Sequence, residues 1–330
     1  MSLYRKILKQ AWQVFWQNKY LGFFGIFAAI LGNGGEYEII FKGLSNDNNQ
    51  EFFPALKRIS ETGIFSGKTL TNIFQIMTED AFSLLLILLI SLAILFLIGF
   101  FIWLAIVSQA ALVNNSAAII LGKKSNFLSG LESGKKNFWP VFGLNILIKI
   151  FIYLILTLVS LPIILSLNKT GLVTANFLYL IAFIIFIPLA ITFAFIIKYA
   201  IAYVVVRSQN FSQALKSGWQ LFVKNWLISF EMAVILFFIN LAVGLAIILA
   251  ILILLVPFLF LAFTFYYLAS LAGFWTITFF GLICLLVLIV LGGACLAVFQ
   301  TAAWTGLFLE LVKNGAQSKL VRVFDQIYNK

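Results

Sequence analysis

The chain has 330 residues, of which 63% are hydrophobic and only 10% are charged, and its formal net charge is +11. A soluble globular domain carries about 25% charged residues, so this composition excludes an ordinary water-soluble fold and favours a chain embedded in lipid. The absence of histidine excludes His-ligated metal sites, Ser-His-Asp and Cys-His triads and a histidine general base.

Six apolar segments are candidates to cross a bilayer as helices, which takes about 20 residues. The first is short, and a half-span or a re-entrant segment is the alternative for it. Pro257 is expected to end or kink the fifth. The sequence therefore predicts an all-α integral membrane protein, a six-helix bundle forming a single membrane domain over 1–330. The six segments are 20–32, 82–107, 139–166, 174–197, 227–256 and 274–300.

Basic residues gather in every second segment between these spans. Both termini and the segments 114–138 and 198–225 are basic, whereas 33–80 carries seven acidic against four basic residues and the 263–273 turn carries no charge. Because basic loops stay on the cytoplasmic side, we expect both termini in the cytoplasm. The basic residues are spread over short segments with no dense tail, which argues against nucleic-acid binding.

A short motif recurs before three of the spans. Residues 7–18 (ILKQAWQVFWQN) and 214–225 (ALKSGWQLFVKN) share six identities in twelve positions, and 126–138 (NFLSGLESGKKNF) matches 210–222 (NFSQALKSGWQLF) at six positions. Each copy has the pattern of an amphipathic helix lying in the membrane interface.

We therefore expect three parallel repeats, each an interfacial amphipathic helix followed by two transmembrane helices. They run at about 1–113, 126–206 and 210–306, and 307–330 forms a cytoplasmic C-terminal tail. The first repeat contains an extracytoplasmic insertion, 33–80, with short helices near 51–60 and 69–79.

The amphipathic helices supply a set of candidate lipid contacts. In the first and third copies, Trp12 and Trp219 are assigned to the apolar stripe, opposite the basic face. Tryptophan and lysine at this level are typical of a helix that meets headgroups of the inner leaflet. The expected partners are membrane lipids, with anionic lipids as candidates. The candidate interfacial residues are Lys9, Trp12, Lys135, Lys136, Lys216 and Trp219.

Three charged residues fall inside the predicted spans and are candidates for function because a charge in lipid is costly. They are Glu231, Lys149 and Lys198. The ungapped repeat register aligns Lys149 with Ala233, at a depth similar to that of Glu231. The hypothesis is that Glu231 pairs with Lys149 or Lys198 in the bundle interior. The alternative is snorkelling to the headgroups or a structural ion pair.

Uncharged polar residues in the spans, among them Asn145, Asn240 and Gln300, are predicted to form interhelical hydrogen bonds. The two cysteines, Cys284 and Cys295, would lie about 16 Å apart on one helix, which is too far for a disulfide. No metal site, cofactor or catalytic residue is predicted.

The three-unit pattern, especially NFSQALKSGWQLFVKNW ahead of a span, resembles uncharacterised six-span bacterial membrane proteins. That group includes the membrane domain found beside glycerophosphoryl diester phosphodiesterase catalytic domains. The catalytic domain of that family uses histidine and glutamate, and this chain has neither the histidine nor the room for it, so no catalytic residue carries over. The resemblance and the richness in Phe, Ile, Lys and Asn favour a multi-pass protein of a bacterial inner (plasma) membrane.

Two functions remain open from the sequence, together with a third that it disfavours. The first is a non-enzymatic membrane protein that organises lipids or partner proteins. The alternative is a transporter or channel for ions or small molecules, with a charged intramembrane site around Glu231, Lys149 and Lys198. An intramembrane enzyme is disfavoured because the spans lack paired carboxylate, HExxH and GxGD motifs.

Overall fold

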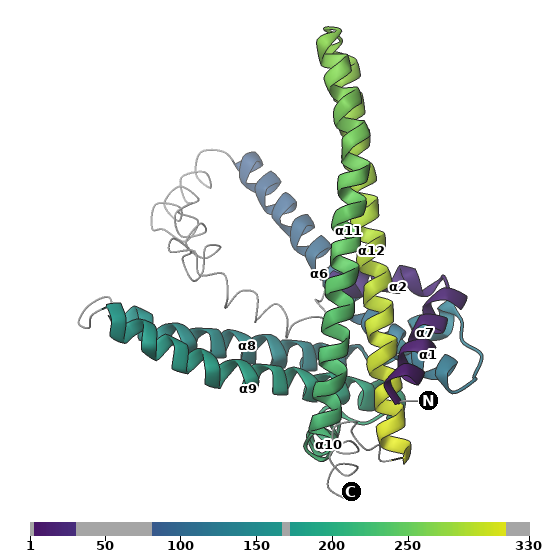
Figure 1. The fold of residues 1–330 in the computed structure, drawn as a ribbon, viewed down its shortest axis with the longest axis vertical. Helices are drawn as coiled ribbons and strands as arrows, with labels where there is room; N and C mark the ends of the chain where they lie inside the picture. The colour runs from purple at the N-terminus through teal and green to yellow at the C-terminus, as the bar shows by residue number, and fades with distance from the viewer. Residues whose placement is uncertain (1–2, 31–80, 167–171, 315–330) are drawn as a thin grey trace, which may run out of the picture. The chain divides into compact units, whose positions relative to one another are not determined.

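A computed structural model describes residues 3–30, 81–166 and 172–314 as helices joined by short turns, with no strand among them (Figure 1). The predictions for 33–80 and for 315–330 lie outside the described residues. The helices are α1 (Leu3–Gln17), α2 (Leu21–Ile30), α6 (Ala81–Ile120), α7 (Phe127–Lys136), α8 (Phe138–Ser166), α9 (Leu172–Arg207), α10 (Phe211–Lys224), α11 (Trp226–Tyr267) and α12 (Leu271–Asn314).

Five of the described helices are long and apolar enough to cross a membrane, which indicates a multi-pass membrane protein. The first predicted span, 20–32, corresponds to α2, whose ten described residues measure about 15 Å. This is half of the roughly 30 Å hydrocarbon core. The five candidate spans are Leu85–Ile120, Phe138–Ile155, Ile184–Arg207, Trp226–Tyr267 and Leu271–Lys313.

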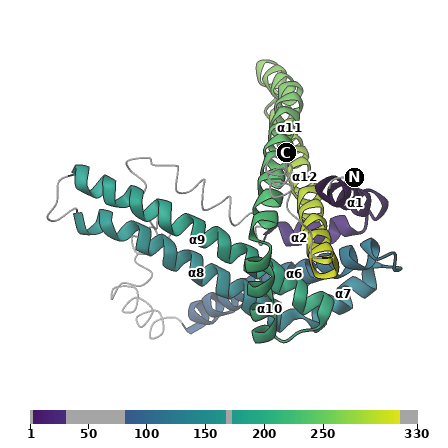
Figure 2. The same ribbon diagram turned by 60° about the horizontal axis from the view of Figure 1, so that its bottom comes forward.

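The chain divides into two compact units. The second unit contains residues 36–104 and 150–191. Within it α8 and α9 run side by side in both views (Figures 1 and 2). Ile155 of α8 and Ala190 of α9 are buried together, with Phe151, Ile152 and Phe186 packed around them. This small apolar contact holds the α8–α9 hairpin together.

The first unit contains residues 1–35, 105–149 and 192–330, and its core is formed by the ends of four long helices. We call this core the base. Its largest fully buried side chains include Tyr199 of α9 and Phe308 of α12. Helices α1 and α2 pack against α12 at this level (Figure 2). The buried residues of the base lie within 105–117 of α6, 194–205 of α9, 228–236 of α11 and 294–311 of α12.

Beyond the base, α11 and α12 continue side by side as a two-helix hairpin (Figure 1). We call residues 237–267 and 271–293 the arm. Apart from Ala262 and Gly281, every residue of the arm is at least partly exposed, and its exposed surface is apolar. The arm portion of α11 is about 46 Å long, close to the 40–45 Å thickness of a bilayer with its headgroups.

Pro257 does not end the fifth span, contrary to one of the two outcomes expected from the sequence. The helix α11 continues through Pro257 to Tyr267 as a single element. Proline removes one helical hydrogen bond, a loss that transmembrane helices tolerate because the freed backbone group is satisfied locally.

The C-terminal boundary also differs from the prediction. Residues 307–314, assigned to a cytoplasmic tail, continue α12. Leu307 and Phe308 have no exposed surface, so this stretch belongs to the base. The two cysteines of α12 are free, as their spacing predicted.

Each amphipathic helix of the first unit is followed by an asparagine that marks the corner into the next helix. The side-chain amide of Asn18 donates to the carbonyl of Val14 at 3.0 Å after α1, and Asn225 makes the same contact with Leu221 at 3.0 Å after α10. Asn137 repeats the contact after α7, donating to the Ser133 carbonyl at 2.9 Å. Three helices thus end with one local geometry.

Glycine lets α7 and α10 approach the base closely. A Cβ added at Gly134 of α7 would lie 2.4 Å from the Val107 carbonyl oxygen, and one added at Gly218 of α10 would lie 2.8 Å from the Ile196 carbonyl oxygen. No side chain fits at these distances. The corresponding place on α1 is occupied by Ala11, which is fully buried.

Candidate functional site

The first candidate site is the outer surface of the amphipathic helices. In α1 the buried face consists of Tyr4, Ile7, Ala11 and Val14. Trp12 lies outside this face and is 56% exposed. The Trp12 and Trp16 rings stack with centroids 5.7 Å apart. The outer face of α1 therefore combines aromatic rings with lysines.

Helix α10 repeats this division. Ala214, Gly218 and Leu221 are buried against the base, whereas Trp219 is 54% exposed and Lys216 is exposed beside it. In the sequence, Trp12 and Trp219 appeared to belong to one continuous apolar stripe. The structure separates that stripe into a narrow face of small residues that packs on protein and an outer edge that carries tryptophan.

Helix α7 and the start of α8 complete the set. Gly130 and Gly134 are the buried residues of α7, and Lys135 and Lys136 are exposed in its last turn. Trp139, two residues after the corner at Asn137, is 75% exposed. All six predicted interfacial residues are therefore exposed on the first unit.

Two polar contacts tie α1 to the spanning helices. The hydroxyl of Tyr4 donates to the carboxylate of Glu231 on α11. The ammonium of Lys6 forms an ion pair with Glu310 of α12, with 2.6 Å between Nζ and Oε1. Two of the three acidic residues in the described ranges therefore face the N-terminal helix.

The structure distributes the three predicted intramembrane charges over different places. Glu231 lies six residues after the corner at Asn225, whereas Lys149 lies twelve residues after the corner at Asn137. Lys149 is about 6 Å further along its span than the ungapped register assumes, because α7 is one turn shorter than α10. Lys149 is exposed, as expected of a snorkelling lysine. An ion pair of Glu231 with Lys149 or Lys198 stays a prediction.

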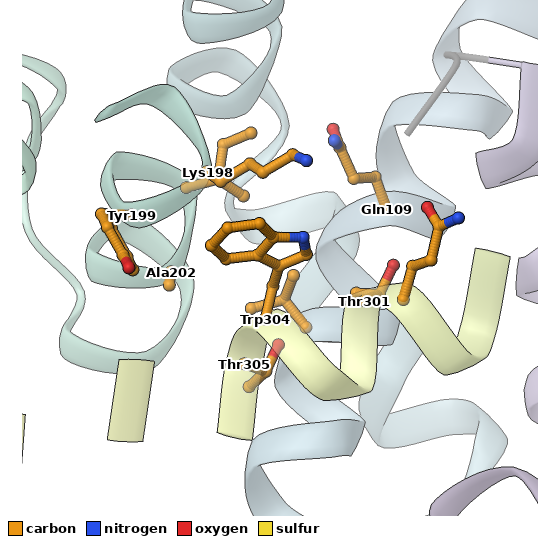
Figure 3. Close-up of a pocket in the computed structure, with 10 residues that line it drawn as sticks. Gln109, Lys198, Tyr199, Ala202, Thr301, Trp304 and Thr305 are labelled. Carbon is orange, nitrogen blue, oxygen red and sulfur yellow. The ribbon is translucent and has the colours of Figure 1, made fainter. Parts of the chain in front are cut away.

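Lys198 lies at a cavity in the base (Figure 3). Its ammonium is 4.7 Å from the ring centroid of Trp304, a cation–π distance. The space open to water is about 50 Å³, which holds roughly four water molecules. The cavity is lined by Gln109 and Val113 of α6, Lys198, Tyr199, Ile201 and Ala202 of α9, and Gln300, Thr301, Trp304 and Thr305 of α12.

Hydrogen bonds hold several polar groups around this cavity. The Asn145 amide donates to Gln109 Oε1 at 2.7 Å, and the Gln300 amide donates to Asn240 Oδ1 at 2.5 Å. The predicted interhelical hydrogen bonds of Asn145, Asn240 and Gln300 are confirmed. Tyr199 also lines the cavity, and its hydroxyl is 2.7 Å from Ser229 Oγ of α11.

Sequence reasoning missed Gln109, Thr301 and Trp304 as cavity residues. The available signal was the presence of glutamine and threonine inside uncharged apolar runs, at 109 and at 300–301. That signal identifies polar groups that need partners. It does not reveal that three helices bring these groups to one lysine.

No protein-family model matches the chain, and neither a curated protein nor a solved structure resembles it closely enough to be compared.

Proposed function

We propose that this protein is a non-enzymatic membrane protein that gathers anionic lipid around its base, with α1, α7 and α10 lying in the headgroup region of the cytoplasmic leaflet. The observation that carries the proposal is the division of faces on these helices. Each buries small or apolar residues on the base, and its outer side presents exposed lysine together with a nearby exposed tryptophan. Tryptophan with lysine is suited to the boundary between headgroups and acyl chains.

The dimensions of the arm support the same placement. If the arm crosses the bilayer, it is long enough to span the full thickness of the membrane. The base, which follows at one end of the arm, then lies at headgroup level. The exposed leucine, isoleucine and phenylalanine side chains of the arm then meet acyl chains. The amphipathic helices surround the base at the depth where basic residues attract anionic lipid.

The proposal includes six spans built as three parallel repeats, with both termini in the cytoplasm of a bacterial cell. The corners at Asn18, Asn137 and Asn225 support the repeats, because each asparagine makes the same contact with the carbonyl four residues earlier. The close approach of Gly134 and Gly218 to the base supports them as well. For a sixth span, α2 has to be continued beyond its described residues.

Spin-labelled lipids test the lipid-gathering function directly, because lipids held at a protein boundary are motionally restricted. The full chain, reconstituted in bilayers, is expected to restrict phosphatidylglycerol more strongly than phosphatidylcholine. Replacing Lys9, Lys135, Lys136 and Lys216 by glutamine should remove this preference and leave the total number of boundary lipids unchanged. Lys149→Gln is the control, because that lysine belongs to α8 and lies twelve residues beyond the corner that follows α7. Equal restriction of the two lipids by the unaltered protein would refute the proposal.

The cavity at Lys198 favours a second candidate function, the passage of a small solute or ion. Of the three charged residues in the transport hypothesis, Lys198 lines the cavity. Glu231 and Lys149 do not line it. Transport predicts a flux of solute into sealed proteoliposomes that Lys198→Gln abolishes. A flux equal to that of protein-free vesicles would remove this candidate.

A further inference from the structure

The charged side chain that lines the cavity of the base is positive. Among the ten described residues that line it, Lys198 carries the one charged side chain, and none of the ten is a carboxylate. The other polar groups of the lining are amides, hydroxyls and an indole nitrogen. A lining with an ammonium and several neutral donors attracts anions.

Several of these donors converge. In Figure 3 the ammonium of Lys198 extends over the Trp304 ring toward the side-chain amide of Gln109. The indole nitrogen of Trp304 and the hydroxyl of Thr301 border the same space. Because Asn145 donates to the Gln109 oxygen, the Gln109 NH2 group is oriented to donate elsewhere. The donors come from three helices, α6, α9 and α12.

The size of the cavity limits what it can take. Room for roughly four waters in about 50 Å³ suits a tetrahedral oxyanion. A phosphate group accepts several hydrogen bonds at once and pairs readily with a lysine ammonium. The cation–π contact with Trp304 fixes the position of the lysine before any anion arrives.

We propose that the cavity lined by Gln109, Lys198, Thr301 and Trp304 binds a phosphate-type oxyanion. The phosphate can come from a lipid headgroup or from free phosphate in the cytoplasm. The headgroup source rests on the proposed function, because it requires the base to lie at headgroup level. The free source does not depend on that placement.

The first arm of the test uses inorganic phosphate. The full chain is placed in nanodiscs of phosphatidylcholine, and phosphate is titrated by calorimetry at constant ionic strength, with chloride as the control anion. The expected result is saturable binding that Lys198→Gln weakens at least tenfold. Thr301→Val, which removes one hydroxyl and keeps the shape, should weaken binding several-fold. Lys149→Gln should leave binding unchanged.

The second arm uses phosphatidylglycerol nanodiscs without free phosphate. The lipids that stay with the protein after transfer to detergent are counted by mass spectrometry. A headgroup site predicts one retained phosphatidylglycerol that is lost in Lys198→Gln and Thr301→Val but kept in Lys149→Gln. Retention here with no binding in the first arm assigns the site to lipid, and the reverse assigns it to free phosphate.

The same variants separate this proposal from the lipid-gathering function. Substituting the four interfacial lysines by glutamine is expected to remove the boundary-lipid preference. Phosphate binding in the cavity is expected to stay intact in the same variant. Thr301→Val keeps the lysine, so a folding defect of Lys198→Gln does not decide the outcome. If neither phosphate nor phosphatidylglycerol binding differs between the unaltered chain and both cavity variants, the cavity holds water alone and the proposal is wrong.

Discussion

Helices α11 and α12 run through both the base and the arm, yet their surroundings in the two regions differ sharply. In the base these helices bury Met232, Leu236 and Phe308, and α1 and α2 pack on α12. In the arm they contact each other, and the remaining surface is exposed leucine, isoleucine and phenylalanine. Composition alone hardly distinguishes the two regions, because both are apolar.

The difference shows which residues pack against protein and which face the lipid acyl chains. Small residues mark the base: Ala294, Ala297, Ala302 and Ala303 of α12 are buried and let neighbouring helices approach. The arm carries large side chains that need no protein partner in a bilayer, since acyl chains are as apolar as leucine. Substitutions of the same type should therefore have different effects in the two regions.

The largest contrast is expected for truncation of phenylalanine. Phe308→Ala should destabilise the protein by about 3–5 kcal/mol, because it opens a cavity in a fully packed site. Phe308 is 0% exposed, whereas Phe260 of the arm is 71% exposed. Phe260→Ala should therefore change stability little. Unfolding in mixed micelles followed by circular dichroism measures both, and comparable losses would mean that the arm is packed against protein in its native state.

The next contrast concerns glycine. Gly134→Ala forces α7 away from the Val107 carbonyl, and overpacking of this kind costs about 1–3 kcal/mol. Gly244 of the arm has no atom within 4 Å of an added Cβ, so Gly244→Ala should leave stability unchanged or raise it slightly through helix propensity. The apparent unfolding midpoints in detergent are the measurement. A neutral Gly134→Ala would show that α7 does not rest on α6 as described.

A smaller contrast is expected for tyrosine hydroxyls. Tyr199→Phe removes a buried hydrogen bond to Ser229 and should cost about 1 kcal/mol. Tyr267, at the tip of the arm, is 83% exposed, and Tyr267→Phe should have no effect on the same unfolding assay. An unchanged stability for Tyr199→Phe would argue that Ser229 finds another partner.

The smallest effect is expected at the ion pair between Lys6 and Glu310. The lysine side chain is 48% exposed, and exposed pairs contribute about 0.2–1 kcal/mol. A double-mutant cycle with Lys6→Gln and Glu310→Gln should give a coupling in this range that decreases with added salt. A coupling that is large and insensitive to salt would place this contact in a drier environment.

Much of the helical architecture could be predicted from the sequence because the hydropathy of a segment does not depend on how that segment packs. Five of the predicted spans lie within described helices: 82–107, 139–166, 174–197, 227–256 and 274–300. Hydropathy does not distinguish the part of an apolar helix that faces lipid from the part that packs against protein. For this reason the sequence prediction places 307–314 in a tail, although Leu307, Phe308 and Leu311 are buried in the base.

The site was harder to predict because side-chain partners depend on helix rotation. The repeat motif identified the helices of Trp12 and Trp219, but it did not separate these exposed side chains from the neighbouring residues that pack on the base. The contact between Tyr4 and Glu231 joins residues 227 positions apart, and nothing local signals it. The cavity at Lys198 required three helices to be placed together.

Cysteine-accessibility labelling tests the central claim that α1, α7 and α10 lie on one side of the membrane. Single cysteines replace the exposed residues Lys9, Lys135 and Lys216 in a chain whose Cys284 and Cys295 are changed to serine, and a membrane-impermeant maleimide is applied to intact cells. The account predicts that all three positions react after the cells are opened and not before. Labelling of any one of them from outside intact cells would contradict it.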